Sequence, residues 1–146
     1  MCEAVTSRAR ETGARGVIAA VTIGIGLIVH WHGAPLGQTA RDVAGDALWA
    51  AMMFWLVSIV APGVRWSVRG VIALCICFAV EVSQRYHTPS LDALRGTTIG
   101  HLVLGSGFDP RDFAAYTAGV LAAMLLDRGL ERRGDQRSRA VVQDRA

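Results

Sequence analysis

The stretch from Arg65 to Gln84 reads RWSVRGVIALCICFAVEVSQ, and it decides the fold that we expect. Arg65 and Arg69 mark one end of an uncharged apolar run, and Glu81 stands at the other end. Such a run is typical of a helix that crosses a bilayer, which needs about 20 residues with a lower limit near 17. A carboxylate at the edge of hydrocarbon is costly and is usually kept for a reason. Glu81 is therefore our first candidate site residue.

Three further stretches share this character, at residues 16–31, 47–64 and 113–126. The last is the shortest, and it spans a bilayer only if Asp112 and Asp127 lie among the headgroups or the bilayer thins locally. The sequence thus predicts an all-α membrane protein with four transmembrane helices and a long polar loop between helices three and four. Residues 1–15 would form an N-terminal segment, residues 16–128 the transmembrane domain and residues 129–146 a charged tail.

Composition supports a membrane protein over a soluble one. Apolar residues make up 52% of the 146 residues and charged residues only 18%, whereas about a quarter of residues are charged in soluble domains. All 15 basic residues are arginines, and they flank the apolar runs, which explains the high isoelectric point without a nucleic-acid partner.

The arginines also predict an orientation. With four spans, the N-terminal segment, the second loop and the tail share one side and carry three, two and six arginines, whereas the first and third loops carry one and three. The positive-inside rule then places both termini in the cytoplasm, for a protein of the bacterial inner membrane. A cleaved signal peptide is the alternative interpretation of the first run, but no small-x-small cleavage pattern follows it.

In this topology, the polar residues that lie within or at the edge of the membrane fall in one layer on the outer side. Asp46 opens the second helix, Glu81 and Gln84 close the third, and Asp112 and Tyr116 open the fourth. Residues three or four apart share a helix face, so the members of the last two pairs lie together. The cytoplasmic half of the bundle is expected to be apolar by contrast.

The carboxylates in this layer also have a structural explanation. Asp46 and Asp112 fall where helix N-termini are expected, and a carboxylate there accepts backbone N–H bonds and suits the helix dipole. Glu81 lies at a helix C-terminus, where the dipole disfavours an acid, so it should have a partner. Arg85 and Arg95 are the nearest cationic candidates, and such a contact would be a purely structural ion pair.

The connection from Arg85 to Arg111 adds Asp92, Arg95 and His101 to the candidate residues. Its middle, residues 96–107, contains an apolar piece that is too short to span a bilayer. The piece either re-enters the bilayer against the bundle or lies flat on the membrane surface. Gly96 and Gly100 are four apart and would give a single helix a small face for packing.

Metal and cofactor motifs are missing from the sequence. The four histidines have no metal-ligand spacing, and Cys75 and Cys77 lie two apart in an apolar run, as buried hydrophobic residues do. There is no phosphate loop, nucleophile elbow or dinucleotide fingerprint. We therefore expect no metal and no cofactor.

Several motifs resemble known membrane families. Residues 81–84 (Glu-Val-Ser-Gln), Arg95 and residues 112–119 (Asp-Phe-Ala-Ala-Tyr-Thr-Ala-Gly) resemble the VanZ-like proteins, which carry Glu-x-x-Gln, a polar loop and Asp-x-x-x-Asn-x-x-Gly. Tyr116 stands where those proteins usually have Asn. An allied bacterial family, domain of unknown function 2809, shares more of the chain: Gly45-Asp46-Ala-Leu-Trp49, the Glu-x-x-Gln pair, Asp92 with Arg95, Gly100-His101-Leu-Val-Leu-Gly105, Phe108, and Asp112 with Tyr116. The resemblance implies a cell-envelope protein, because VanZ-like proteins are linked to glycopeptide-antibiotic tolerance, and it implies no settled reaction.

These observations lead to one main hypothesis and two alternatives. The main hypothesis is a membrane protein with an outward-facing polar pocket for the headgroup of an envelope lipid or precursor, lined by Asp46, Glu81, Gln84, Asp92, Arg95, His101, Asp112 and Tyr116. Membrane lipids are its expected partners. The first alternative is a structural or accessory subunit whose membrane-protein partner does the work. The second is a lipid-modifying enzyme that uses carboxylates for acid–base chemistry.

Overall fold

The structure is a computed structural model that describes residues 2–105 and 107–143. Those residues form helices joined by turns, with no strand among them. The elements follow in the order α1 (Cys2–His32), the 3-10 helix η1 (Ala34–Leu36), α2 (Gln38–Val60), α3 (Trp66–Ser83), α4 (Pro89–Arg95), α5 (Thr98–Leu104) and α6 (Asp112–Gln143). The chain is therefore all-α, as its sequence predicts.

Four of these helices are long and apolar enough to cross a membrane. The spans are Glu11–His32 in α1, Gln38–Val60 in α2, Trp66–Ser83 in α3 and Asp112–Arg132 in α6. The fourth span was the doubtful one, and it reaches 21 residues because α6 continues through Asp127 without a break. The prediction of four membrane-spanning helices is confirmed at the level of helix length and composition.

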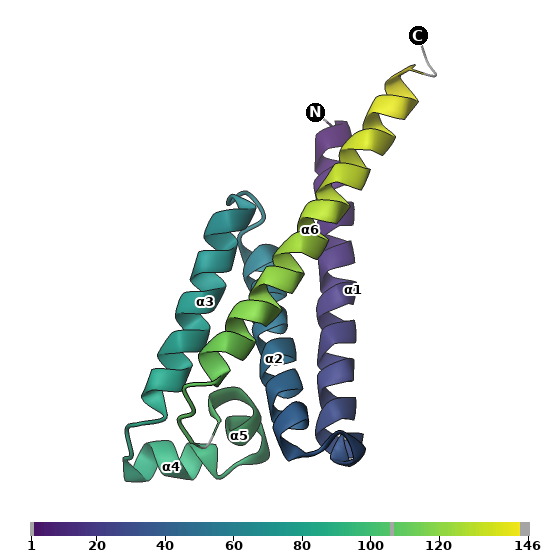
Figure 1. Cartoon of the computed structure of the whole chain (residues 1–146). Helices are drawn as coiled ribbons and strands as arrows, with labels where there is room; N and C mark the ends of the chain where they lie inside the picture. The colour runs from purple at the N-terminus through teal and green to yellow at the C-terminus, as the bar shows by residue number, and fades with distance from the viewer. Residues whose placement is uncertain (1, 106, 144–146) are drawn as a thin grey trace.

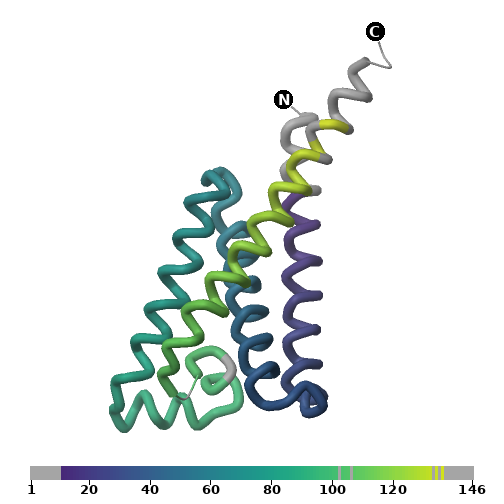
Figure 2. The backbone as a smooth tube through the Cα atoms, in the orientation of Figure 1, coloured from purple at the N-terminus to yellow at the C-terminus, as the bar shows by residue number. Residues whose placement is uncertain are grey.

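Helix α2 is the centre of the bundle. It packs against α1, α3 and α6, and α3 also packs against α6, while α1 has only a small further contact with α6. Both termini and the turn between α2 and α3 lie at one end, which we call the terminal end (Figures 1 and 2). The 3-10 helix and the short helices α4 and α5 lie at the opposite end, which we call the pocket end (Figure 1).

The core lies where α2, α3 and α6 meet. Its fully buried side chains are a mixture of aromatic and small residues: Ala50, Phe54, Trp55, Ala73, Cys77, Val120 and Ala123. Gly119 sits where α6 crosses α2, and a Cβ there would collide with the backbone of Ala47. The missing side chain thus lets the two helices approach closely.

Helix α2 begins earlier than its apolar run suggests. It starts at Gln38, so Asp46 lies more than two turns inside the helix and does not cap it. The capping explanation for Asp46 is therefore wrong. Asp112 does open its helix, in the first turn of α6, where its charge suits the dipole.

The connection between α3 and α6 is folded into two short helices. Thr88 caps α4 by accepting the N–H of Leu91, and Thr97 caps α5 by accepting the N–H of Gly100. Gly96 ends α4, whereas Gly100 lies within α5. The two glycines therefore do not share a helix face, contrary to our expectation.

A buried ion cluster occupies the terminal end, where we expected apolar packing. Arg15 of α1 and Arg69 of α3 meet Asp127 and Glu131 of α6. The bonds are short: Arg15 Nε–Asp127 Oδ1 is 2.7 Å, Arg69 Nη2–Asp127 Oδ2 is 3.0 Å, and both arginines lie 2.8 Å from Glu131 Oε1. The expectation failed because arginines at the ends of two spans turn inward to acids of a third.

Candidate functional site

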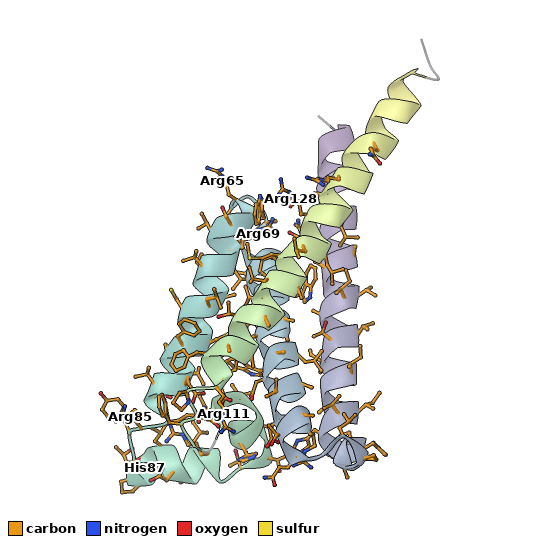
Figure 3. All side chains as sticks on the ribbon, viewed as in Figure 1. Arg65, Arg69, Arg85, His87, Arg111 and Arg128 are labelled. Carbon is orange, nitrogen blue, oxygen red and sulfur yellow. The ribbon has the colours of Figure 1, made fainter. Side chains whose placement is uncertain are left out.

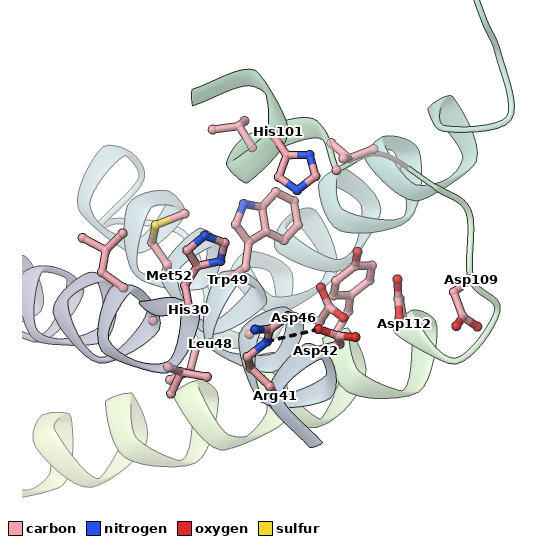
Figure 4. A pocket seen from close by; sticks show the side chains of 18 of the residues that line it. His30, Arg41, Asp42, Asp46, Leu48, Trp49, Met52, His101, Asp109 and Asp112 are labelled. Atoms are coloured by element: carbon pink, nitrogen blue, oxygen red, sulfur yellow. Dashed lines mark ion pairs between the residues drawn. The ribbon is translucent and has the colours of Figure 1, made fainter. Parts of the chain in front are cut away.

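A cavity of about 660 Å³ opens at the pocket end. Helices α1 and α2, the segment that includes α5, and the start of α6 form its walls (Figure 4). Its polar lining includes Gln38, Arg41, Asp42, Asp46, Asp109 and Asp112, and its apolar lining includes Ile23, Leu27, Leu48, Met52, Val80 and Val103. The cavity therefore combines a charged part with an apolar part.

Glu81 lies beneath the cavity and is completely buried. Its Oε2 accepts the Tyr116 hydroxyl at 2.9 Å and the Gln84 side-chain N–H at 3.2 Å, and its Oε1 accepts the backbone N–H of Asp109 at 2.7 Å. These bonds join α3 to the start of α6. Glu81 thus holds Tyr116 and Gln84 in the cavity wall instead of facing the cavity itself.

The expected arginine partners of Glu81 are engaged elsewhere. Arg95 donates to the carbonyls of Ser83 at 2.8 Å and Tyr86 at 2.9 Å, so it caps the C-terminus of α3. Arg85 stacks its guanidinium over the ring of Phe108, 5.2 Å from the centroid. A tyrosine, an amide and a backbone N–H replace the expected ion pair.

Asp46 and Asp112 form the most unusual contact of the site. Asp46 lies on α2 and Asp112 on α6, and their carboxyl groups both line the cavity, close enough to interact (Figure 4). Among the residues that the structure describes, no arginine or histidine forms an ion pair with either of them. Arg41 lines the cavity too, but its ion pair is with Asp42, at 3.7 Å (Figure 4). The facing carboxyls are left without a balancing cation.

Trp49 supplies the aromatic wall. Its ring centroid lies 5.6 Å from that of Tyr116. Figure 4 shows the indole beside His30 of α1 and His101 of α5. Its Nε1 is buried and has no hydrogen-bond partner within the described chain. An indole N–H of this kind can donate to an acceptor on a bound molecule.

The structure sorts the eight candidate residues into three groups. Asp46, Gln84, His101, Asp112 and Tyr116 line the cavity, and Glu81 supports it from below. Asp92 and Arg95 lie outside the lining. Asp92 bonds His87 at 3.1 Å and lies 3.7 Å from Arg95, which is three residues later on α4 and caps the end of α3.

Several lining residues were not predicted. The sequence suggested that the second helix begins at Asp46, but the early start of α2 places Arg41 and Asp42 within it, about one helical turn before Asp46. Asp109 reaches the cavity because the loop before α6 returns over Glu81. Trp49 was visible in the sequence, three residues after Asp46 and on the same face.

The chemistry of the lining favours binding. Carboxyls attract amines and hydroxyls, Arg41 offers a donor for an anionic group, and Trp49 and Tyr116 offer flat apolar faces. Among the residues that the structure describes, no serine or cysteine lines the cavity, and there is no group of three or more His, Cys, Asp or Glu side chains that could hold a metal ion.

Basic side chains lie at both ends of the bundle. Arg65, Arg69 and Arg128 lie at the terminal end, and Arg85, His87 and Arg111 lie at the pocket end (Figure 3).

Comparison with known proteins identifies a family but no activity. No solved structure matches the chain. A family model described as "Protein of unknown function (DUF2809)" matches residues 36–120, more than half of the chain. The match covers α2 to α5 and the part of α6 that carries Asp112 and Tyr116. The chain therefore belongs to this family, DUF2809.

Proposed function

We propose that the chain binds the headgroup of an envelope lipid or lipid-linked precursor in its cavity, and that this headgroup carries a protonated amine. The facing carboxyls of Asp46 and Asp112 carry the proposal. Two carboxylates in contact repel each other unless a proton or a cation lies between them. An ammonium group supplies that charge and donates hydrogen bonds to both.

The rest of the cavity fits the remainder of such a molecule. Arg41 lies at the mouth and is only loosely paired with Asp42, so its guanidinium can bind the phosphate of a zwitterionic headgroup. Ile23, Leu27 and Met52 line the part of the cavity nearer the middle of the spans and suit a hydrocarbon chain. The lining thus changes from charged to apolar in the same order as a lipid changes from headgroup to hydrocarbon tail.

The location completes the proposal. Arginines dominate the end that holds both termini, which favours that end facing the cytoplasm of a bacterial cell. The cavity would then open toward the outer leaflet of the inner membrane. A kinship with VanZ-like envelope proteins agrees with such a ligand and forms part of the proposal.

Lipid binding to the purified protein tests the function. The probes are phosphatidylethanolamine, phosphatidylcholine and phosphatidylglycerol with identical acyl chains, and bound lipid is counted by native mass spectrometry. Phosphatidylethanolamine should bind most tightly because only its primary ammonium can donate to both carboxyls. Asp46→Asn and Asp112→Asn should each lower that affinity at least tenfold, about 1.4 kcal/mol.

The matched control is Asp92→Asn, which removes a carboxyl of the same end that does not line the cavity. Its affinity should equal that of the unchanged protein. Equal binding of all three lipids, or an equal loss in the control, would show that the cavity does not recognise an amine.

A structural role is the second candidate, and the buried bonds of Glu81 favour it. Tyr116, Gln84 and Asp109 satisfy Glu81 without any ligand, as in a cluster that locks helices together. If the chain serves only as an accessory subunit, lipid selectivity is absent and a stoichiometric membrane partner co-purifies. Acid–base catalysis by the Asp46–Asp112 pair would instead give turnover of a labelled envelope lipid.

A further inference from the structure

The cavity has side walls that face outward as well as inward. Ile23 of α1 and Val103 of α5 both line the cavity, yet 42% and 46% of their surfaces are exposed. His30 and His101 repeat this pattern, since both line the cavity and both are exposed. Residues of this kind mark the open part of the cavity, because they line it and are also accessible from the surroundings.

The two edges belong to α1 and α5, and neither of these helices is the main packing partner of the other. The main packing partner of α1 is α2, and that of α5 is α4. Helices α1 and α5 therefore lie on either side of α2 where the cavity opens (Figures 1 and 4). Trp49 of α2 lies between their two histidines, behind the opening (Figure 4).

The α1 edge of the opening lies within a membrane span. Ile23 is nine residues from the end of the span Glu11–His32, which corresponds to about 14 Å along the helix axis. That distance is close to half the thickness of the hydrocarbon core, which is roughly 30 Å. Along the intervening turns, α1 exposes Ile25 and Ile28, as a lipid-facing helix does. An opening at this depth faces acyl chains.

We infer that the gap between α1 and α5 is a lateral portal through which the acyl chain of a bilayer lipid enters the cavity from the membrane. Its edges carry apolar side chains at Ile23 and Val103 and imidazoles at His30 and His101. The chain of the lipid lies against Ile23, Leu27 and Met52, and its headgroup reaches the carboxyls at the mouth. The inference rests on the proposed function only in naming a lipid as the occupant.

Trp49 provides a direct reporter of the portal. Bromine atoms on acyl chains quench tryptophan emission on contact, and the indole of Trp49 lines the cavity. Trp55 lies on the same helix but is fully buried in the core, so it serves as the internal control. Trp31→Phe and Trp66→Phe together remove the other two tryptophans and leave Trp49 and Trp55.

The measurement compares emission in vesicles of plain and mid-chain-brominated phosphatidylcholine. A large part of the emission should be lost in the brominated lipid, and the further change Trp49→Phe should abolish that loss. Val103→Phe should reduce the loss by narrowing the portal, whereas Val68→Phe, an equally exposed valine of α3 that does not line the cavity, should leave it unchanged.

Quenching of Trp49 by aqueous iodide but not by brominated chains would overturn the inference, since the cavity would then open only to water. A loss that persists after Trp49→Phe would overturn it too, because it would come from Trp55. Phosphatidylcholine has no primary amine, so this result is independent of amine recognition. The portal can therefore be confirmed while the proposed headgroup fails, or the reverse.

Discussion

Buried charged groups occur at both ends of the bundle, and the two ends treat them differently. At the terminal end, Arg15 and Arg69 face Asp127 and Glu131, and the four charges balance within one cluster. At the pocket end, the carboxyls of Asp46 and Asp112 are half-buried and form no ion pair with a cation of the described chain. Both arrangements use α6, which carries acids at each end of its span.

The difference separates a structural cluster from a candidate site. Burying a charge within a membrane protein is costly unless a partner offsets it. Charges that balance within one cluster need no further partner of opposite charge, and the cluster of the terminal end fastens α1, α3 and α6 together. Unbalanced carboxyls beside a cavity do need such a partner, and the missing positive charge is what a ligand can bring.

The largest effect is expected from Asp127→Ala at the terminal end. Asp127 is fully buried and bonds both arginines, so its removal leaves Arg15 and Arg69 with Glu131 alone. Breaking a buried ion pair by removing one partner costs about 3–5 kcal/mol. Thermal unfolding of the detergent-purified protein should show a large fall in melting temperature.

Glu131→Ala is the variant with which the loss of stability in Asp127→Ala is compared. Its side chain is partly exposed and accepts from the same two arginines, so water can replace some of its bonds. The loss should be clearly smaller than that of Asp127→Ala. Equal and small losses for both variants would mean that the cluster does not fasten the helices.

An intermediate effect is expected from Gly119→Ala at the pocket end. A Cβ at this position would meet the backbone of Ala47, next to Asp46, and neither helix can yield locally. Overpacking of this kind typically costs about 1–3 kcal/mol and moves the backbone. Melting temperature should fall, and the affinity for phosphatidylethanolamine should fall with it because the Asp46–Asp112 contact is displaced.

Gly70→Ala is the matched change where α3 meets α6. There the Cβ would meet only the flexible end of Met124, which can swing aside. Stability should change little and lipid affinity should stay the same. If Gly119→Ala and Gly70→Ala lower the melting temperature equally, the close approach of α2 and α6 is no more important to stability than the contact of α3 with α6.

The sequence predicted the fold class because its signal is long and uniform. Runs of apolar residues near 20 in length, bounded by arginines, leave few alternatives to membrane-spanning helices. Helix boundaries were less accurate, because hydropathy marks where lipid begins and not where a helix begins. The start of α2 at Gln38, well before its apolar run, shows the difference.

The sequence predicted the depth of the site residues in the membrane, but it did not predict which residues bond one another. Hydropathy placed Asp46, Glu81 and Asp112 at the same end of the spans, and the structure brings them together. It could not show that Glu81 bonds Tyr116 instead of an arginine, because that depends on how the connection before α6 folds back. The ion cluster of the terminal end escaped notice for a similar reason, since rotation of a helix decides whether a flanking arginine faces headgroups or an acid.

Asp46→Asn is expected to have the smallest effect on stability, although its effect on lipid binding is large. Asp46→Asn removes one negative charge from a pair that already lacks a cation, and an amide can still donate to Asp112. Melting temperature in detergent without added lipid should therefore stay level or rise slightly, unlike the fall expected for Asp127→Ala. Ligand-induced stabilisation by phosphatidylethanolamine should disappear at the same time, because affinity and stabilisation are linked. A fall in unliganded stability as large as that of Asp127→Ala would place the pair with the fastening cluster of the terminal end and remove the reason to seek its ligand.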